Sequence, residues 1–131
     1  MDTAAPRLPV SVQGIVIEGK KMGRRLGFPT ANLRMPSEDA HLPFGVYVAT
    51  VKLSDGRMLQ GVLNHGRHPT LPEGQPTVEV HLFDFDEDLY GQSVQVTYLL
   101  FLRPEVCFQT KEAMRAQVFE DMEKAKRYFE T

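Results

Sequence analysis

The acidic side chain best suited to proton transfer is Glu79, which lies in the strongly alternating segment 77–83. If the apolar residues of this segment face a core, Glu79 and His81 share the opposite face. A carboxylate held on a rigid strand can act as a general base and accept the proton of an attacking alcohol. The alternative is an ordinary solvated glutamate, and alternation alone does not choose between the two.

Two neutral oxygen donors, Thr30 and Asn32, stand two positions apart directly after Pro29. Proline fixes its own φ and extends the residue before it, so the donors follow a stiff segment, and in an extended chain both point to one side. Such a pair suits a hard divalent cation already held by nucleotide phosphates. The alternative is a turn in which both side chains bond their own backbone.

A glycine-rich basic loop precedes these donors, with Gly19, Gly23 and Gly27 enclosing four Lys or Arg residues. Glycines let backbone N–H groups converge on an anion, and the basic side chains add charge suited to phosphates. The loop has neither the Gly-x-x-x-x-Gly-Lys-[Ser/Thr] motif nor the dinucleotide-binding glycine spacing. It is therefore either a phosphate-binding loop or a flexible, solvated connection.

The elements that position these residues belong to one domain, which we assign to residues 1–131 with 1–9 as a flexible N-terminal extension. A chain of 131 residues, of which 42% are hydrophobic, is long enough for one core and has no repeats or linker-like stretches. Strand periodicity and short turns fill the first 100 or so residues. This pattern predicts a mainly β fold, an antiparallel sheet of five or six strands closed into a small barrel. The clearest expected strands are 11–18, 45–53, 58–64, 77–83 and 93–102.

Alternation predicts which faces of these strands turn inward. In segment 45–53, one face carries Tyr47, Ala49, Val51 and Leu53. In segment 93–102, we expect one side to hold Val94, Val96, Tyr98, Leu100 and Leu102.

Near the C-terminus, the spacing of the apolar residues changes from the two-residue alternation of strands to that of a helix. This change predicts a single helix of about five turns. Thr110 is a suitable N-cap, and Glu112 lies in the first turn. One stripe at helical spacing consists of Met114, Val118, Met122, Ala125 and Phe129. We expect this stripe to pack against the barrel.

Composition excludes several classes of function. The 15 Lys and Arg residues are balanced by 17 Asp and Glu residues, and a net charge of −2 provides no strong field for nucleic acid or an anionic membrane. Cys107 is the only cysteine, so an internal disulfide framework is excluded. There is no apolar run of membrane-spanning length and no secretory pattern at the start, so we expect a cytoplasmic protein.

Several stretches, taken in order, resemble the riboflavin kinase (flavokinase) family. The resemblance runs from about Gly14 to the C-terminal helix, and Pro-Thr-Ala-Asn is its most specific motif. The matching segments are 19–32 ending in Pro29-Thr30-Ala31-Asn32, Gly45-Val46-Tyr47, Asn64-x-Gly66-x-x-Pro69-Thr70, Val78-Glu79-Val80-His81-Leu82, Asp86-x-Asp88-Leu89-Tyr90-Gly91 and Arg103-Pro104-Glu105-x-x-Phe108.

The resemblance implies a six-stranded antiparallel Greek-key barrel with a C-terminal α-helix packed against it. It also implies transfer of the γ-phosphoryl group of ATP to the 5′-hydroxyl of riboflavin, giving FMN and ADP, with Mg²⁺ or another divalent cation bound to the nucleotide. The expected partners are the small molecules riboflavin and ATP, with neither nucleic acid nor membrane, and we expect a monomer.

Roles follow residue by residue from the same resemblance. Glu79 is the implied catalytic base, and Thr30 and Asn32 are the implied metal and phosphate ligands. The implied ATP-binding residues are Gly19, Gly23, Arg24, Thr30, Asn32, Leu82, Asp84 and Tyr90. The implied riboflavin-binding residues, which would border the isoalloxazine ring, are Arg103, Val106 and Phe108.

The chain departs from the family's usual pattern at the basic pair Lys20-Lys21 and at the apolar Val106. Many bacterial relatives carry an N-terminal FMN adenylyltransferase domain that nothing here resembles, so the chain is either a stand-alone kinase or the kinase half of a bifunctional protein. The competing hypothesis is a barrel that binds a flavin or nucleotide without chemistry. Retention of Glu79 together with Thr30 and Asn32 favours the kinase.

Overall fold

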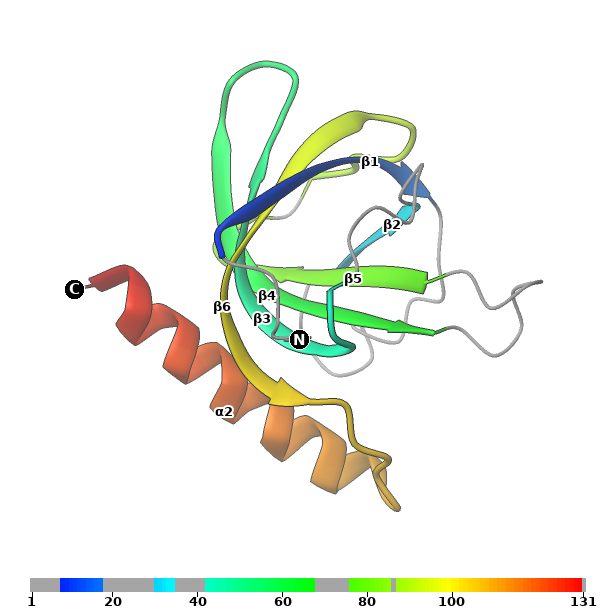
Figure 1. Cartoon of the computed structure of the whole chain (residues 1–131), viewed down its shortest axis with the longest axis vertical. Coiled ribbons are helices and arrows are strands. Elements are labelled where there is room, and N and C mark those ends of the chain that lie inside the picture. Colours follow the sequence, from blue (N-terminus) through cyan, green and yellow to red (C-terminus); the bar gives the residue numbers. More distant parts are fainter. Residues whose placement is uncertain (1–7, 18–29, 35–41, 68–75, 86, 131) are drawn as a thin grey trace, which may run out of the picture.

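The computed structural model describes residues 8–17, 30–34, 42–67, 76–85 and 87–130. These residues form a β-barrel with one long helix lying across its outside (Figure 1). The strands are β1 (Val10–Ile17), β2 (Thr30–Arg34), β3 (Gly45–Lys52), β4 (Met58–Arg67), β5 (Pro76–Leu82) and β6 (Ser93–Pro104), and the helix is α2 (Lys111–Glu130).

Antiparallel pairing closes the barrel in the order β1-β2-β5-β4-β3-β6, with β6 returning to β1. Strands β3, β4 and β5 are neighbours in sequence and in space, and β6 lies beside β3. Three consecutive strands with a fourth returning beside the first define a Greek key. The prediction of a mainly β barrel with this topology and a C-terminal helix is confirmed, and the strand that sequence alone had left uncertain is β2.

The barrel interior is filled by the inward faces of all six strands. The largest fully buried side chains include Tyr47 and Tyr98, whose rings meet edge to face at a centroid distance of 5.0 Å. Their hydroxyls are satisfied, since Tyr47 donates to the Pro43 carbonyl at 2.6 Å and Tyr98 bonds His65 Nδ1 at 2.9 Å. The inward face predicted for β3 is therefore correct.

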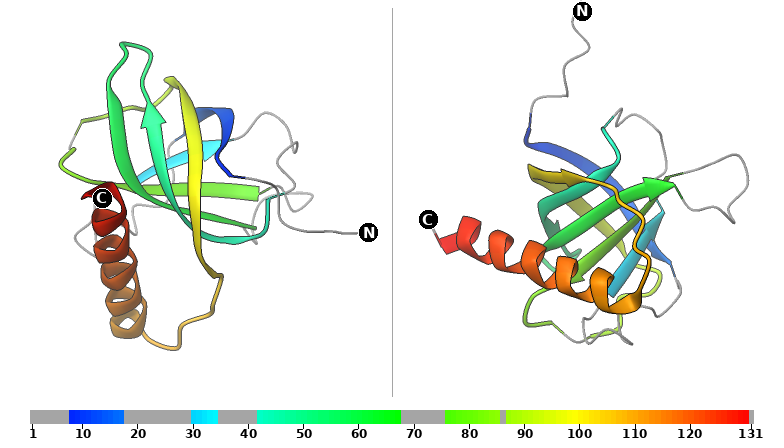
Figure 2. Two further views of the ribbon diagram at one scale, coloured as in Figure 1. Left: turned by 60° about the vertical axis from the view of Figure 1, so that its left-hand side comes forward. Right: turned by 90° about the horizontal axis from the view of Figure 1, so that it is seen from below.

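Helix α2 packs against the outer surface of β3 and β4, at the end of the barrel opposite the hairpin that joins these strands (Figure 2). Its Ala125 belongs to a second apolar cluster with Val46, Val48 and Val62. Thr110 caps the helix, because its Oγ1 accepts the Ala113 N–H at 3.0 Å. The predicted helix and its packing face are confirmed.

The face predicted for the second half of β6 is wrong. Pairing between β3 and β6 shifts register twice, and each shift leaves one extra residue on β6, first Leu99 and then Leu102. A β-bulge of this kind interrupts the two-residue alternation. Leu100 is consequently 41% exposed, and Leu102 packs in the cluster beneath the helix rather than inside the barrel.

The close approach of β4 and β5 at Gly61 generates a prediction for stability. A Cβ at this position would overlap the backbone carbonyl of His81, which lies in a paired strand and cannot easily move. We expect Gly61→Ala to lower the free energy of unfolding by about 3 kcal/mol, as overpacking does. Urea denaturation measures the loss.

Gly56→Ala is the matched control, because a Cβ there meets nothing within 4 Å and only the positive φ of +96° is strained. Its loss should be about 1 kcal/mol. Equal losses for the two variants would contradict the steric role of Gly61.

Candidate active site

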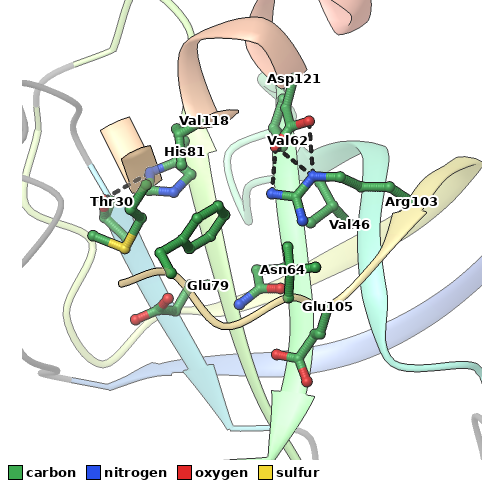
Figure 3. Close-up of a pocket in the computed structure, with 13 residues that line it drawn as sticks. Thr30, Val46, Val62, Asn64, Glu79, His81, Arg103, Glu105, Val118 and Asp121 are labelled. Atoms are coloured by element: carbon green, nitrogen blue, oxygen red, sulfur yellow. Dashed lines mark hydrogen bonds and ion pairs between the residues drawn. The ribbon is translucent and has the colours of Figure 1, made fainter. Parts of the chain in front are cut away.

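A cavity of about 300 Å³ lies between the outer face of the barrel and helix α2 (Figure 3). Strands β2 to β6 supply one side of it, and the segment after β6 and the helix supply the other. It is lined by Thr30, Val46, Val62, Asn64, Glu79, His81, Arg103, Glu105, Val106, Phe108, Met114, Val118 and Asp121.

The register of the strands places polar side chains next to one another on the barrel side of this cavity. Glu79 on β5 is paired with Asn32 on β2 and with Asn64 on β4. Directly paired residues of antiparallel strands project from the same face. The alternate residues Ala31 and Leu33 are buried in the core, so Thr30 and Asn32 point outward together, and Glu79 is partly buried in the same cavity.

Thr30 is held by His81, the residue paired with it across β2 and β5. Thr30 Oγ1 lies 3.1 Å from His81 Nδ1. Burial lowers the pKa of His81 from 6.5 to about 4, an effect that the nearby Asp121 charge only partly opposes. The ring is therefore neutral at pH 7, and its Nδ1 can accept a hydrogen bond from the Thr30 hydroxyl, which leaves the oxygen lone pairs of Thr30 for a ligand.

The donor set fits a divalent cation that arrives with phosphates. Within the described ranges, no group of three or more His, Cys, Asp or Glu side chains is arranged to hold a metal ion by itself. Mg²⁺ commonly takes one or two protein oxygens and completes its shell with waters and substrate phosphates. Thr30 and Asn32 offer neutral oxygens beside Glu79, so the residues present suit that arrangement rather than an all-protein metal cage.

The opposite wall is formed by Arg103 and the segment that follows it. The guanidinium carbon of Arg103 lies 5.8 Å from the centroid of Phe108, within cation–π range. Val106 is 57% exposed and also lines the cavity. An aromatic ring and a guanidinium plane provide the flat surfaces that a planar ligand needs.

The structure thus brings together Glu79, Thr30, Arg103, Val106 and Phe108, with Asn32 on the same face beside Glu79. It does not bring the remaining described candidates to the cavity lining. Leu82 is buried in the barrel core, Asp84 is exposed, and Tyr90 is 66% exposed. Gly19, Gly23 and Arg24 lie outside the described residues.

Four polar residues at the cavity had no role assigned from sequence, namely Asn64, His81, Glu105 and Asp121. Asn64 and Glu105 stand inside the matched motifs, and only their spatial neighbours show that they reach the site. The carboxylate of Glu105 packs against Gly66, where a Cβ would overlap it. Asp121 carried a usable signal, because an acidic residue three positions after Val118 and four before Ala125 falls on the apolar stripe of the helix.

The comparisons with known proteins concern almost the whole chain. Residues 6–129 match the family model Flavokinase, described as riboflavin kinase. A bifunctional riboflavin kinase/FMN adenylyltransferase of Haemophilus influenzae is 40% identical over 121 residues, which are 92% of this chain and 39% of that protein. The chain therefore spans about two fifths of the length of this relative.

Two solved structures share the architecture. One, described as a macrolide-efflux protein from Streptococcus pneumoniae, superposes with a TM-score of 0.79 at 31% identity and covers 91% of this chain and 38% of that one. The riboflavin kinase of Trypanosoma brucei superposes with a TM-score of 0.65 over 99% of this chain and 83% of that one. Its identity of 19% makes it evidence for the fold alone.

The environment of His81 predicts a dependence of stability on pH. The folded pKa of about 4 lies below the unfolded value of 6.5, so between them the unfolded chain binds more protons. The contribution of His81 to the free energy of unfolding is thus fully present above pH 6.5. It is lost as the pH falls through 4, and the loss is at most about 3 kcal/mol.

NMR titration of the imidazole measures this directly. We expect the His81 ring to stay neutral at pH 6 and the His81→Gln variant to lose less stability than the wild type between pH 6.5 and 4. A midpoint near 6.5 in the folded protein would contradict the burial argument.

Proposed function

Because the chain belongs to the riboflavin kinase family, we propose that it transfers the γ-phosphoryl group of ATP to the 5′-hydroxyl of riboflavin, giving FMN and ADP. The observation that carries the proposal is one cavity in which Glu79 lies between polar oxygen donors on β2 and a flat wall at Arg103 and Phe108. Phosphoryl transfer needs an alcohol, a base and a held triphosphate in one place. This cavity offers surfaces of the right kind for each.

Glu79 is the proposed general base. As the riboflavin 5′-oxygen attacks the γ-phosphorus, the bond to the ADP oxygen breaks and the hydroxyl proton passes to the Glu79 carboxylate. The paired strands on both sides of β5 fix the backbone at Glu79 and the face from which its side chain projects, so the base is presented by a rigid element.

Thr30 and Asn32 are the proposed ligands of the nucleotide-bound cation, with Mg²⁺ as the expected ion. The cation that they would hold would supply neutralisation of the negative charge on the phosphates. The two side chains supply neutral oxygens, since the triphosphate itself supplies the negative charge. His81 orients Thr30 for this task through the contact between Nδ1 and Oγ1.

The riboflavin ring is proposed to lie against Arg103, Val106 and Phe108 with its ribityl chain toward Glu79, which lines the same cavity. The remaining assignments stay predictions. These are phosphate contacts from Gly19, Gly23 and Arg24, and nucleotide contacts from Leu82, Asp84 and Tyr90. A monomeric state and a cytoplasmic location are likewise expectations. In the part of the chain that the structure describes, no helix combines the length and the apolar character of a membrane span.

The alternative, a barrel that binds a flavin or nucleotide without chemistry, is less favoured. A pure binding module has no need of a carboxylate on the floor of the cavity beside Thr30 and Asn32. Membership of a family of kinases points the same way.

The function is tested by incubating the protein with riboflavin and Mg·ATP and separating the flavins by chromatography. We expect FMN from the wild type and a loss of about a hundredfold or more in turnover for Glu79→Gln, the magnitude of a missing general base. Riboflavin binding should persist in that variant.

Glu87→Gln is the control, since Glu87 is exposed and paired with Arg57 away from the cavity, and it should match the wild type. If no FMN forms with the wild type, the proposed function is wrong. If FMN forms and Glu79→Gln turns over normally, only the base assignment fails.

The assignment of Thr30 is tested by binding rather than turnover. We expect Thr30→Ala to weaken Mg·ADP about tenfold, which corresponds to ~1.4 kcal/mol, and to leave riboflavin affinity unchanged. Thr30→Ser keeps the hydroxyl and should bind Mg·ADP nearly as the wild type does. Calorimetry that found riboflavin weakened and Mg·ADP unaffected would overturn the assignment.

A further inference from the structure

Asp121 is a buried carboxylate for which the proposed chemistry has no use. It lies on the barrel-facing side of α2 and is only 1% exposed. Removing a carboxylate from water is costly unless it is paired and hydrogen-bonded. Its surroundings therefore show what the fold gains from placing a charge there.

The partners of Asp121 fix one guanidinium in position. Arg103 Nε lies 3.0 Å from Oδ1 and 3.1 Å from Oδ2 of Asp121, and Arg103 Nη2 lies 2.7 Å from Oδ2. Gln117 donates from Nε2 to Oδ1 at 3.1 Å, which holds the carboxylate from within the helix. A fork of this kind sets both the direction and the plane of an arginine.

Arg103 stands at the cavity wall, and a third nitrogen of its guanidinium is also bonded within the chain. Its Nη1 donates to the Pro104 carbonyl at 3.2 Å, and its side chain is 17% exposed. The guanidinium carbon faces the ring of Phe108 at 5.8 Å. Figure 3 shows the Asp121–Arg103 pair above Asn64 and Glu105 on the opposite side of the cavity from Thr30 and His81.

We propose that Asp121, supported by Gln117, is a positioning residue for the flavin side of the cavity. It holds Arg103 as a flat surface beside Phe108 and neutralises the charge of the Arg103 guanidinium. Such a surface suits a neutral planar ring. The proposal rests on the proposed function and deepens it by assigning a determinant of ring specificity on the helix. Asp121 acts through Arg103 and does not itself react.

Neutralising the charge of Arg103 gives the cavity wall its preference for an uncharged ring over an anion. An unpaired arginine at this wall would attract anions, whereas the isoalloxazine ring is uncharged. Pairing with Asp121 leaves the π-face of the guanidinium for stacking and removes its preference for an anionic ligand. The proposed nucleotide ligands Thr30 and Asn32 lie on β2, and Asp121 is linked to them through its charge on the neighbouring His81, which weighs less than burial in setting the pKa of that ring.

The test compares two ligands in a double-mutant cycle. We expect Asp121→Asn to raise the Kd for riboflavin about tenfold, measured by quenching of flavin fluorescence, and to change the Kd for Mg·ADP less than twofold. In steady state, the KM for riboflavin should rise while kcat changes little, because a wall for the ring contributes uniform binding. In an Arg103→Ala background, Asp121→Asn should have no further effect on riboflavin.

Glu123→Gln is the control on the same helix, since its partner Lys126 is 4.0 Å away and both side chains are about half exposed. It should bind both ligands as the wild type does. If Asp121→Asn does not fold, Gln117→Leu removes only the supporting hydrogen bond, and we expect riboflavin to weaken about threefold with Mg·ADP unchanged.

Two results would overturn the proposal. One is an equal loss of riboflavin and Mg·ADP affinity in the folded variants, which would give Asp121 a purely structural role. The other is a full additional loss on top of Arg103→Ala. Because riboflavin binding is read without turnover, failure of the proposed kinase activity in the wild type would be seen separately.

Discussion

The site depends on the pairing of β5 between β2 and β4. With both edges hydrogen-bonded, β5 cannot slide, and its valines at 78 and 80 are fully buried in the barrel. A slip of one residue would exchange these valines with Glu79 and His81, at the cost of burying two ionisable groups. Packing of the core therefore holds Glu79 outward, beside Thr30 and Asn32, before any substrate is bound.

The helix turns this face of the barrel into a cavity. It covers Val46, Val48 and Val62, which are apolar residues on the outer side of strands whose inner side is already buried. Its one buried charge, Asp121, ties it to Arg103 at the end of β6. The same contact thus closes the second core and builds the wall opposite Glu79.

Local patterns explain which features could be predicted from sequence. Alternation predicted the inward faces of β3 and β5, and spacing predicted the N-cap and stripe of α2. The outward turn of Leu100 could not be predicted, since it follows from two bulges set by pairing with β3. The meeting of Asn64, Glu105 and Asp121 at one cavity depends on three distant segments. The family resemblance, rather than periodicity, assigned roles to Glu79 and Arg103.

In the proposed reaction, the alcohol of riboflavin meets Glu79 on the outer face of the barrel, under the helix. The most direct measurement is the distance between the riboflavin 5′-oxygen and the Glu79 carboxylate in a crystal structure with riboflavin and Mg·ADP. We expect a hydrogen bond between these two groups, at about 2.6–3.2 Å. A vitamin bound elsewhere, with its hydroxyl out of reach of Glu79, would contradict it.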